Sequence, residues 1–183
     1  MSVPSSARVL YLSYLSRPAQ DRAIYRAIRR QPVRSILEMG LGFGQRALRM
    51  IEMASRACPD EPVRYVGVDL FEMRTAADGP GVTLKMAHRL LKASGAKIQL
   101  LPGDPFSALA RSANSLPKID LVVVSSRWDA ANLAPAWFYV PRLLHDDSRV
   151  FVETQQAEGK PSMRLVSPDE VRALAGSAMR RAA

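Results

Sequence analysis

Glycines and acidic residues stand where they could bind a ligand, each just after a run of apolar residues. The segment 38–44 reads Glu-Met-Gly-Leu-Gly-Phe-Gly and follows the apolar pair Ile36-Leu37. Because glycine has no Cβ, it lets the backbone turn tightly and approach a ligand closely. A dinucleotide loop needs the spacing Gly-x-Gly-x-x-Gly. Gly40 and Gly42 fit that spacing, but Gln45 stands at its third position.

The charge of Glu38 bears on which ligand this loop would take. A pyrophosphate binds at a helix N-terminus, and a carboxylate directly ahead of the loop would repel it. The same carboxylate suits a ligand with an ammonium group. S-adenosylmethionine (SAM) carries an ammonium and a sulfonium and no phosphate. The loop therefore favours SAM over a dinucleotide. The alternative is a tight turn that packs a helix on a strand and binds nothing.

Two aspartates follow later apolar segments. Asp69 ends the segment 63–69, and a carboxylate there can accept both hydroxyl hydrogens of a ribose. Its alternative is a turn or capping residue. Asp104 follows the segment 97–101, and its alternative is the N-cap of a helix that begins at Pro105. Both alternatives stay open.

The pattern Glu38-x-Gly40-x-Gly42-x-Gly44 after a strand resembles the first motif of the class I SAM-dependent methyltransferases. The resemblance covers residues 35–153 and continues through Asp69, Gly103-Asp104 and Asp120. It implies that SAM is the cofactor, that Asp69 holds the ribose diol, that Leu70 packs on the adenine and that Asp104 accepts from the adenine amino group. The predicted cofactor-binding residues are Glu38, Gly40, Gly42, Gly44, Asp69, Leu70, Asp104, Phe106 and Ser125.

Catalytic residues are harder to name, because alignment of nucleophile and methyl supplies much of the acceleration in methyl transfer. An oxygen nucleophile can still need a base, for which the candidates are Asp129, His145 and Glu153. The segment 125–129 lacks the Asn/Asp-Pro-Pro-Tyr/Phe motif of some DNA and protein methyltransferases. Ser125 stands where metal-dependent catechol-type enzymes carry aspartate, so no metal is predicted. Trp128 either stacks on a flat substrate or packs on the sheet edge.

The elements that must position these residues alternate between strand and helix. Strands are predicted at 35–38, 63–69, 97–101, 120–124 and 149–153, and helices after Gly44, from Thr83 to Ala93 and from Phe106. A helix capped by Ser16 is expected from Pro18 to Arg30. This order predicts an α/β, Rossmann-like, doubly wound and mostly parallel sheet with helices on both faces. Ligands of such sheets bind beyond the carboxyl ends of the strands.

The chain reads as one domain, 1–183, with an N-terminal helical segment 1–33, a core 34–153 and a short C-terminal extension 154–183. After the fifth strand only 163–166 reads as a further strand, followed by a helix that Ser167 caps, so the fold is predicted to be truncated there. Pro141 is expected to break the apolar segment 134–144. A short tail is compatible with a homodimer that completes the site, with a large substrate, or with SAM binding without catalysis.

Composition narrows the partners. The formal net charge is +9, and Arg22, Arg26, Arg29 and Arg30 cluster on one predicted helix. Such charge attracts nucleic acid and acidic metabolites, yet no aromatic–basic interleaving supports base stacking. No apolar run approaches the roughly 20 residues that span a bilayer. A single cysteine, Cys58, excludes an internal disulfide and fits a cytoplasmic protein.

The sequence thus predicts a SAM-dependent methyltransferase that acts on oxygen or nitrogen of a small molecule. One alternative is an RNA methyltransferase, which the arginine cluster motivates. Another is a non-catalytic SAM-binding or scaffold protein on the same fold, since fold does not establish function. An NAD-dependent oxidoreductase is disfavoured by Glu38 and Gln45.

Overall fold

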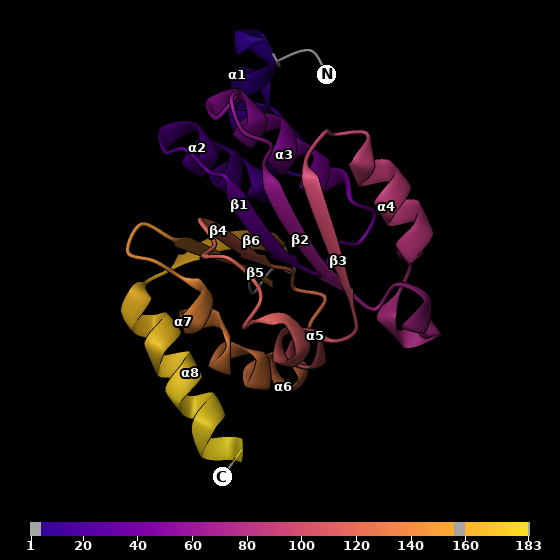
Figure 1. The fold of residues 1–183 in the computed structure, drawn as a ribbon, viewed down its shortest axis with the longest axis vertical. Coiled ribbons are helices and arrows are strands. Elements are labelled where there is room, and N and C mark those ends of the chain that lie inside the picture. Colours follow the sequence, from indigo (N-terminus) through magenta and orange to yellow (C-terminus); the bar gives the residue numbers. More distant parts are fainter. Residues whose placement is uncertain (1–4, 156–159, 183) are drawn as a thin grey trace.

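A six-stranded sheet forms the centre of the computed structural model, which describes residues 5–155 and 160–182 (Figure 1). The spatial order is β3-β2-β1-β4-β5-β6. The first five strands are parallel, and the sixth is antiparallel to β5. The predicted doubly wound, mostly parallel fold is confirmed. The strands are β1 (Ser35–Met39), β2 (Arg64–Asp69), β3 (Lys97–Pro102), β4 (Leu121–Val124), β5 (Arg149–Gln155) and β6 (Pro161–Val166).

Helices cover both faces of this sheet, as predicted (Figure 1). One layer contains α1 (Ser6–Tyr14), the 3-10 turn η1 (Ala19–Asp21), α2 (Arg22–Arg30), α3 (Gln45–Ala57) and α4 (Leu84–Lys92). The other contains α5 (Pro105–Ser112), α6 (Ala130–Leu133), η4 (Ala134–Phe138), α7 (Val140–Leu143) and α8 (Pro168–Ala182). Two short 3-10 turns, η2 (Phe71–Met73) and η3 (Ala76–Asp78), follow β2.

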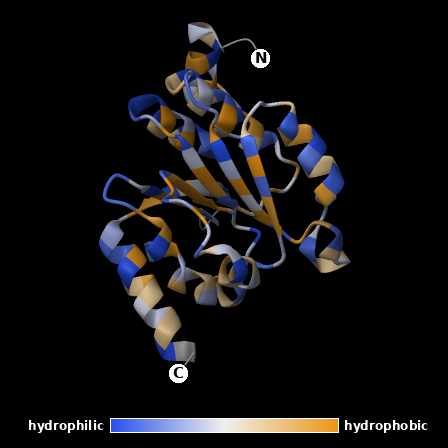
Figure 2. Cartoon of the chain, viewed as in Figure 1, coloured by the Kyte–Doolittle hydropathy of each residue, from blue (hydrophilic) through white to orange (hydrophobic). Residues whose placement is uncertain are grey.

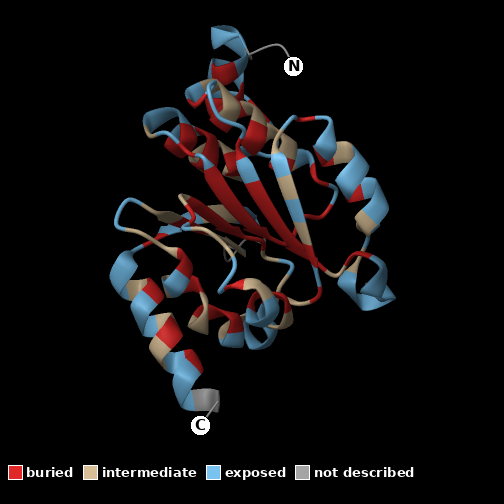
Figure 3. Cartoon of the chain, in the orientation of Figure 1, coloured by how far each residue is buried: buried red, intermediate tan, exposed pale blue. Residues whose placement is uncertain are grey.

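The central strands are buried because both faces of the sheet are covered. Every residue of β1 and β4 is buried, and neighbouring residues contribute alternately to two apolar clusters, with Ile36 on one side and Leu37 on the other. The strands are mostly apolar, whereas the outer faces of the helices are polar and exposed (Figures 2 and 3). In the part of the chain that the structure describes, no helix is long and apolar enough to cross a membrane.

Several predicted boundaries are confirmed by their capping bonds. The side chain of Thr83 accepts from the backbone nitrogen of Met86 at the start of α4, and Gly95 beyond its end has a φ of +75°. Ser167 accepts from the backbone nitrogen of Glu170 at the start of α8. Each cap satisfies a backbone donor that the first helical turn leaves unpaired.

Other expectations need correction. Ser16 does not cap a helix, because its hydroxyl donates to the carbonyl of Leu12 and closes α1 instead. The helix expected from Pro18 is a 3-10 turn followed by α2, and the preceding α1 was not predicted. The segment 134–144 is divided as expected, but the break precedes Pro141, which lies in the first turn of α7. The expected strand 163–166 begins at Pro161 and pairs with β5. The fold thus continues one strand beyond the point of truncation.

Asp120 joins the N-terminal ends of the central strands, on the edge opposite the glycine loop. Its carboxylate accepts from the backbone nitrogens of Arg34 at 2.7 Å and Ser35 at 2.8 Å. The ring nitrogen Nε2 of His145 lies 2.9 Å from its other oxygen. Burial alone would raise the pKa of Asp120, but these hydrogen bonds outweigh burial and lower the pKa below its usual value of 3.8.

We expect Asp120→Ala to lower the free energy of unfolding at pH 7 by about 1–2 kcal/mol, because two backbone donors lose their acceptor. Since the pKa of this carboxyl is lower in the folded chain than in the unfolded one, its contribution is present above about pH 4. That contribution is lost as the pH falls through the folded-state pKa. Urea unfolding of both proteins between pH 7 and pH 3 measures the difference. A difference that does not narrow at acid pH would contradict this account.

Candidate functional site

The ends of β1, β2, β3 and β4 are tied together by backbone hydrogen bonds at one edge of the sheet. Gly40 donates to the carbonyl of Val68 at 2.8 Å, and Gly103 donates to that of Asp69 at 2.9 Å. Ser125 donates to the carbonyl of Met39, also at 2.8 Å. The segments that follow four strands are therefore brought together where the strand order reverses between β1 and β4. This is the position at which open α/β sheets bind ligands.

The loop between β1 and α3 depends on its glycines. Gly40, Gly42 and Gly44 have φ values of +96°, +61° and +76°, in the region that residues with a Cβ avoid. Space is also short, because a Cβ on Gly40 would lie 2.6 Å from Cβ of Ser125. A Cβ on Gly42 would lie 3.5 Å from Nε of Arg127. The loop therefore brings its backbone close to the segment that follows β4.

Asp69, at the end of β2, is buried and holds this loop in place. Its Oδ2 accepts from the backbone nitrogen of Gly42 at 3.0 Å. Its Oδ1 accepts from the backbone nitrogen of Leu70 at 2.6 Å and from the guanidinium of Arg74. Arg74 therefore lies on the carboxylate that the resemblance assigns to a ribose, and a ribose could use both oxygens only after Arg74 moves.

Glu38 is fully buried at the end of β1, and its charge is matched within the protein. Its carboxylate accepts from Nε of Arg46 at 2.7 Å and from the hydroxyl of Tyr65. Arg46 also lies 3.5 Å from Oδ1 of Asp21 and 3.4 Å from Oε2 of Glu153. One guanidinium thus serves three carboxylates. We call Arg46, Glu38, Asp21 and Glu153 the Arg46 cluster. The predicted contact of Glu38 with a ligand ammonium stays a prediction.

The Arg46 cluster shifts the pKa of each of its members. Burial raises the pKa of Glu38 and of Asp21, and Arg46 only partly offsets it. Burial alone would also raise the pKa of Glu153, but Arg46 and hydrogen bonds from Ser126 and its neighbours lower it overall. Burial would lower the pKa of Arg46, yet the surrounding carboxylates hold it above its usual value. At neutral pH Arg46 is therefore charged and strongly bound in place.

A cavity of about 20 Å³ lies between the glycine loop, the residues after β2 and the residues after β4. Arg74, Arg127 and Trp128 help to line it. Two buried donors, Nε of Arg74 and Nε1 of Trp128, have no hydrogen-bond partner among the described residues. A buried donor without a partner costs about 1–3 kcal/mol. The cleft is therefore nearly filled by its own side chains, and it would accept a ligand that offers oxygen or nitrogen acceptors.

SAM fits this donor set. Its carboxylate, ribose oxygens and adenine nitrogens are acceptors that Nε1 of Trp128 could serve, and its ribose hydroxyls can donate to Asp69. The positive φ values of the loop glycines leave a backbone surface without Cβ atoms at the cleft. A bound cofactor of this size would need more than 20 Å³, since small-molecule sites occupy about 300–1,000 Å³. Binding therefore requires Arg74, Arg127 or Trp128 to move outward.

Other predicted cofactor residues lie at the same edge with their own partners. Asp104 accepts from the backbone nitrogen of Ser107 at 3.0 Å, so its alternative role as the N-cap of α5 is confirmed. Phe106 is 41% exposed and packs on Tyr139, with 5.9 Å between ring centroids. Ser125 donates to Oε2 of Glu153 at 3.1 Å.

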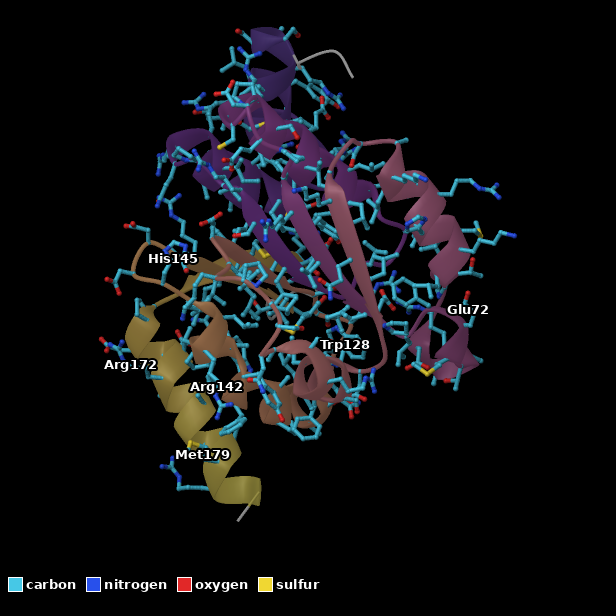
Figure 4. All side chains as sticks on the ribbon, viewed as in Figure 1. Glu72, Trp128, Arg142, His145, Arg172 and Met179 are labelled. Atoms are coloured by element: carbon cyan, nitrogen blue, oxygen red, sulfur yellow. The ribbon has the colours of Figure 1, made fainter. Side chains whose placement is uncertain are left out.

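The three candidate bases are not brought together. Glu153 lies beside Ser125 at the site and belongs to the Arg46 cluster. Asp129 is exposed and caps α6 by accepting from the backbone nitrogen of Asn132 at 2.7 Å. His145 contacts Asp120 at the opposite edge of the sheet, and it lies in a different part of the molecule from Trp128 (Figure 4). Among the described residues, no group of three or more His, Cys, Asp or Glu is placed to hold a metal ion.

The residues that sequence reasoning missed are mostly basic. Arg46 and Arg74 reach Glu38 and Asp69, eight and five residues away, through side-chain conformations that residue spacing does not indicate, and Arg127 donates to the distant carbonyl of Pro80. One signal was present for Arg46. It stands in the first turn of α3, where the helix dipole disfavours a cation, so an unusual partner was to be expected there.

Comparisons with known proteins bear on the fold. No family model matches the sequence, and no curated protein matches it. The O-methyltransferase TomG from Streptomyces achromogenes, solved in complex with SAM, has a TM-score of 0.58 at 16% identity, over 99% of this chain and 79% of that one. A TehB-like SAM-dependent methyltransferase from Corynebacterium glutamicum has a TM-score of 0.53 at 14% identity, over 92% and 77% of the two chains. The chain has the class I methyltransferase fold.

A third structure with this fold matches a smaller part of this chain. Precorrin-6y C5,15-methyltransferase from Geobacter metallireducens has a TM-score of 0.53 at 15% identity, and the match covers 79% of this chain. The chain spans 66% of that protein's length, just under two thirds. In this chain the glycine loop and Asp69 meet at the carboxyl ends of the parallel strands.

Proposed function

We propose that this chain is a SAM-dependent methyltransferase that acts on oxygen or nitrogen of a small molecule. The observation that carries the proposal is the hydrogen bond of 3.0 Å from Gly42 to Asp69, which joins the glycine loop to the acid after β2. The glycine loop follows β1, next to the point where the strand order reverses between β1 and β4. The likeness of the fold to TomG, which was solved with SAM, supports the choice of cofactor.

When bound, SAM supplies a methyl group on a positively charged sulfur. In the proposal Asp69 accepts the ribose hydroxyls once Arg74 has moved, and Leu70 packs on the adenine. Nε1 of Trp128, unpartnered and buried, donates to an acceptor atom of the bound molecules. Asp104 keeps its capping bond to α5 and offers its other oxygen. Closing side chains exclude water from the cleft.

Alignment, and not a dedicated base, carries the rate in this proposal. Of the three candidate bases, only Glu153 lies at the site, and its oxygen accepts from Ser125 and Ser126 at 3.1 and 3.2 Å. Its lowered pKa makes it a weak proton acceptor. We infer that Glu153 positions the segment after β4. A cytoplasmic location also belongs to the proposal, since the single cysteine, Cys58, is buried and unpaired.

Asp69→Ala is expected to weaken SAM binding about tenfold to a hundredfold, equal to about 1–3 kcal/mol, because the ribose hydroxyls lose their acceptor. Arg74→Met is expected to strengthen it severalfold, because the ligand no longer competes with an ion pair. Calorimetric titration of SAM, S-adenosylhomocysteine and NAD into each folded protein measures these differences.

Circular dichroism provides the control that both variants are folded. Binding of SAM and not NAD to the wild-type protein, with opposite effects of the two variants, supports the proposal. Failure of SAM to bind the folded wild-type protein would remove it. A weakening by Arg74→Met would instead mean that Arg74 contacts the ligand directly.

A further inference from the structure

A second and larger cavity lies on the face of the sheet that α2 covers, at the edge formed by β5 and β6. Its volume is about 490 Å³, within the range of about 300–1,000 Å³ of small-molecule sites. From α2 it is lined by Ala23, Arg26, Ala27 and Arg30. These positions are three or four residues apart and therefore share one face of the helix. The two alanines leave the space that larger side chains would fill.

The strands provide the rest of the lining and make its floor apolar. Phe151 of β5 is paired with Leu165 of β6, so both side chains point to the same face. Phe151 is buried, whereas Leu165 is 55% exposed. Arg149 points to this face as well, two residues before Phe151, and its guanidinium donates to the carbonyl of Ala27 at 2.9 Å. We call this cavity the arginine groove.

The charge of the arginine groove is not compensated. Arg26 and Arg30 are exposed, and neither has a hydrogen bond or ion pair to any described residue. No acidic residue is among those that line the groove. The other two arginines of the predicted cluster have partners elsewhere: Arg22 donates to the carbonyl of Ser16 at 2.8 Å, and Arg29 lies 5.4 Å from the ring centroid of Tyr14. The cluster is thus divided, and only part of it faces the groove.

We propose that the arginine groove binds a small amphiphilic anion. Arg26 and Arg30 hold a phosphate, sulfate or carboxylate head, because guanidinium groups bind such oxygens through paired N–H donors. The apolar body of the ligand lies on Leu165, which is 55% exposed, where removing apolar surface from water is favourable. A nucleic acid fits less well, because the aromatic ring of the floor is buried and offers no face for base stacking.

The arginine groove is separate from the candidate SAM cleft. Arg149 is the first residue of β5, so the groove extends toward the N-terminal ends of the strands. The cleft lies at their carboxyl ends. Ligand binding to the groove therefore does not depend on the proposed methyltransferase function, and each of the two proposals can fail alone.

Octyl phosphate, titrated below its micelle concentration, tests the proposal by calorimetry without SAM. We expect binding to the wild-type protein and at least about tenfold weaker binding to the double variant Arg26→Ala/Arg30→Ala, because hydrogen bonds to charged groups are lost. The matched control Arg89→Ala/Lys92→Ala removes two exposed charges from α4 and should leave the affinity unchanged. An equal loss in both double variants would show a general charge effect and overturn the proposal.

Two further ligands distinguish the contribution of the charged head from that of the apolar body. Octyl glucoside, with a neutral head, and inorganic phosphate, without an apolar body, should each bind at least about tenfold more weakly than octyl phosphate. Leu165→Ser should weaken the binding of octyl phosphate and leave the binding of inorganic phosphate unchanged. Absence of octyl phosphate binding, or equal binding of octyl glucoside, would overturn the proposal. A short single-stranded RNA could also displace octyl phosphate. If that displacement required Arg26 and Arg30, it would overturn the proposal in favour of a nucleic-acid surface.

Discussion

Replacing Arg46 with methionine is expected to lower the free energy of unfolding at pH 7 by about 3–5 kcal/mol, the cost typical of removing one partner from a buried ion pair. The Arg46 side chain is 13% exposed, and its guanidinium lies 2.7 Å from Oε1 of Glu38, 3.4 Å from Oε2 of Glu153 and 3.5 Å from Oδ1 of Asp21. Methionine replaces only the aliphatic part of the arginine side chain and would leave these carboxylates buried together without a cation. Urea unfolding at pH 7 measures the change.

Two further variants test whether removal of the buried positive charge of Arg46 causes the loss of stability. Arg46→Lys keeps the charge but not the planar set of donors. Its free energy of unfolding should therefore lie between those of the wild-type protein and Arg46→Met. Arg89→Met removes an exposed arginine from α4 and should change stability by less than about 0.5 kcal/mol. If Arg46→Met and Arg89→Met differed by less than about 1 kcal/mol, the Arg46 cluster would not be a source of stability.

The pH dependence of Arg46→Met has a defined sign. Burial already raises the pKa of Glu38 and of Asp21, and loss of the neighbouring cation raises both further. A carboxyl with a folded-state pKa above its unfolded value favours the folded state at low pH and loses that contribution as the pH rises through the folded pKa. The destabilisation by Arg46→Met should therefore be smaller at pH 5 than at pH 7.

Gly40→Ala is expected to cost about 2–5 kcal/mol of stability and to abolish SAM binding. A residue with a Cβ at a φ of +96° is strained by about 1–2 kcal/mol. Its Cβ would also lie 2.6 Å from Cβ of Ser125 and 3.2 Å from Nε1 of Trp128, and overpacking of this kind typically costs about 1–3 kcal/mol. Thermal or urea unfolding and a SAM titration check both effects.

Gly95→Ala is the matched control, because it isolates backbone strain from crowding. Gly95 has a φ of +75°, and a Cβ there would have no atom within 4 Å. Its substitution should cost about 1–2 kcal/mol and leave SAM binding unchanged. Equal losses in Gly40→Ala and Gly95→Ala would mean that close packing of the glycine loop on Ser125 adds nothing.

Much of the fold followed from local pattern. The strands predicted at 35–38 and 120–124 became β1 (35–39) and β4 (121–124), whose residues are all buried, and Thr83 and Ser167 capped the helices expected after them. Such features depend on neighbours within a few residues. The helix α1 was missed because its apolar run is short and interrupted by Ser13, and it is stabilised by tertiary packing of Val9 and Leu12.

The candidate site could be predicted only in its backbone. The glycine loop and Asp69 follow strands, and parallel strands must end at one edge, so their proximity could be expected. The partners of Glu38 and Asp69 could not, because Arg46 and Arg74 reach them through side-chain conformations that no spacing encodes. For the same reason the sequence did not indicate that the candidate base His145 lies beside Asp120 at the other edge of the sheet.

The small volume of the cleft has a consequence for the rate of ligand capture. Under the proposed function, a cavity of about 20 Å³ is too small for SAM, so only molecules in which lining side chains, among them Arg74, have moved outward can begin binding. The measured dissociation constant then exceeds the intrinsic one by the reciprocal of the open fraction. At high ligand concentration the observed association rate would level off at the rate of opening. Arg74 would thus set a gate whose speed is independent of how much cofactor the cell contains.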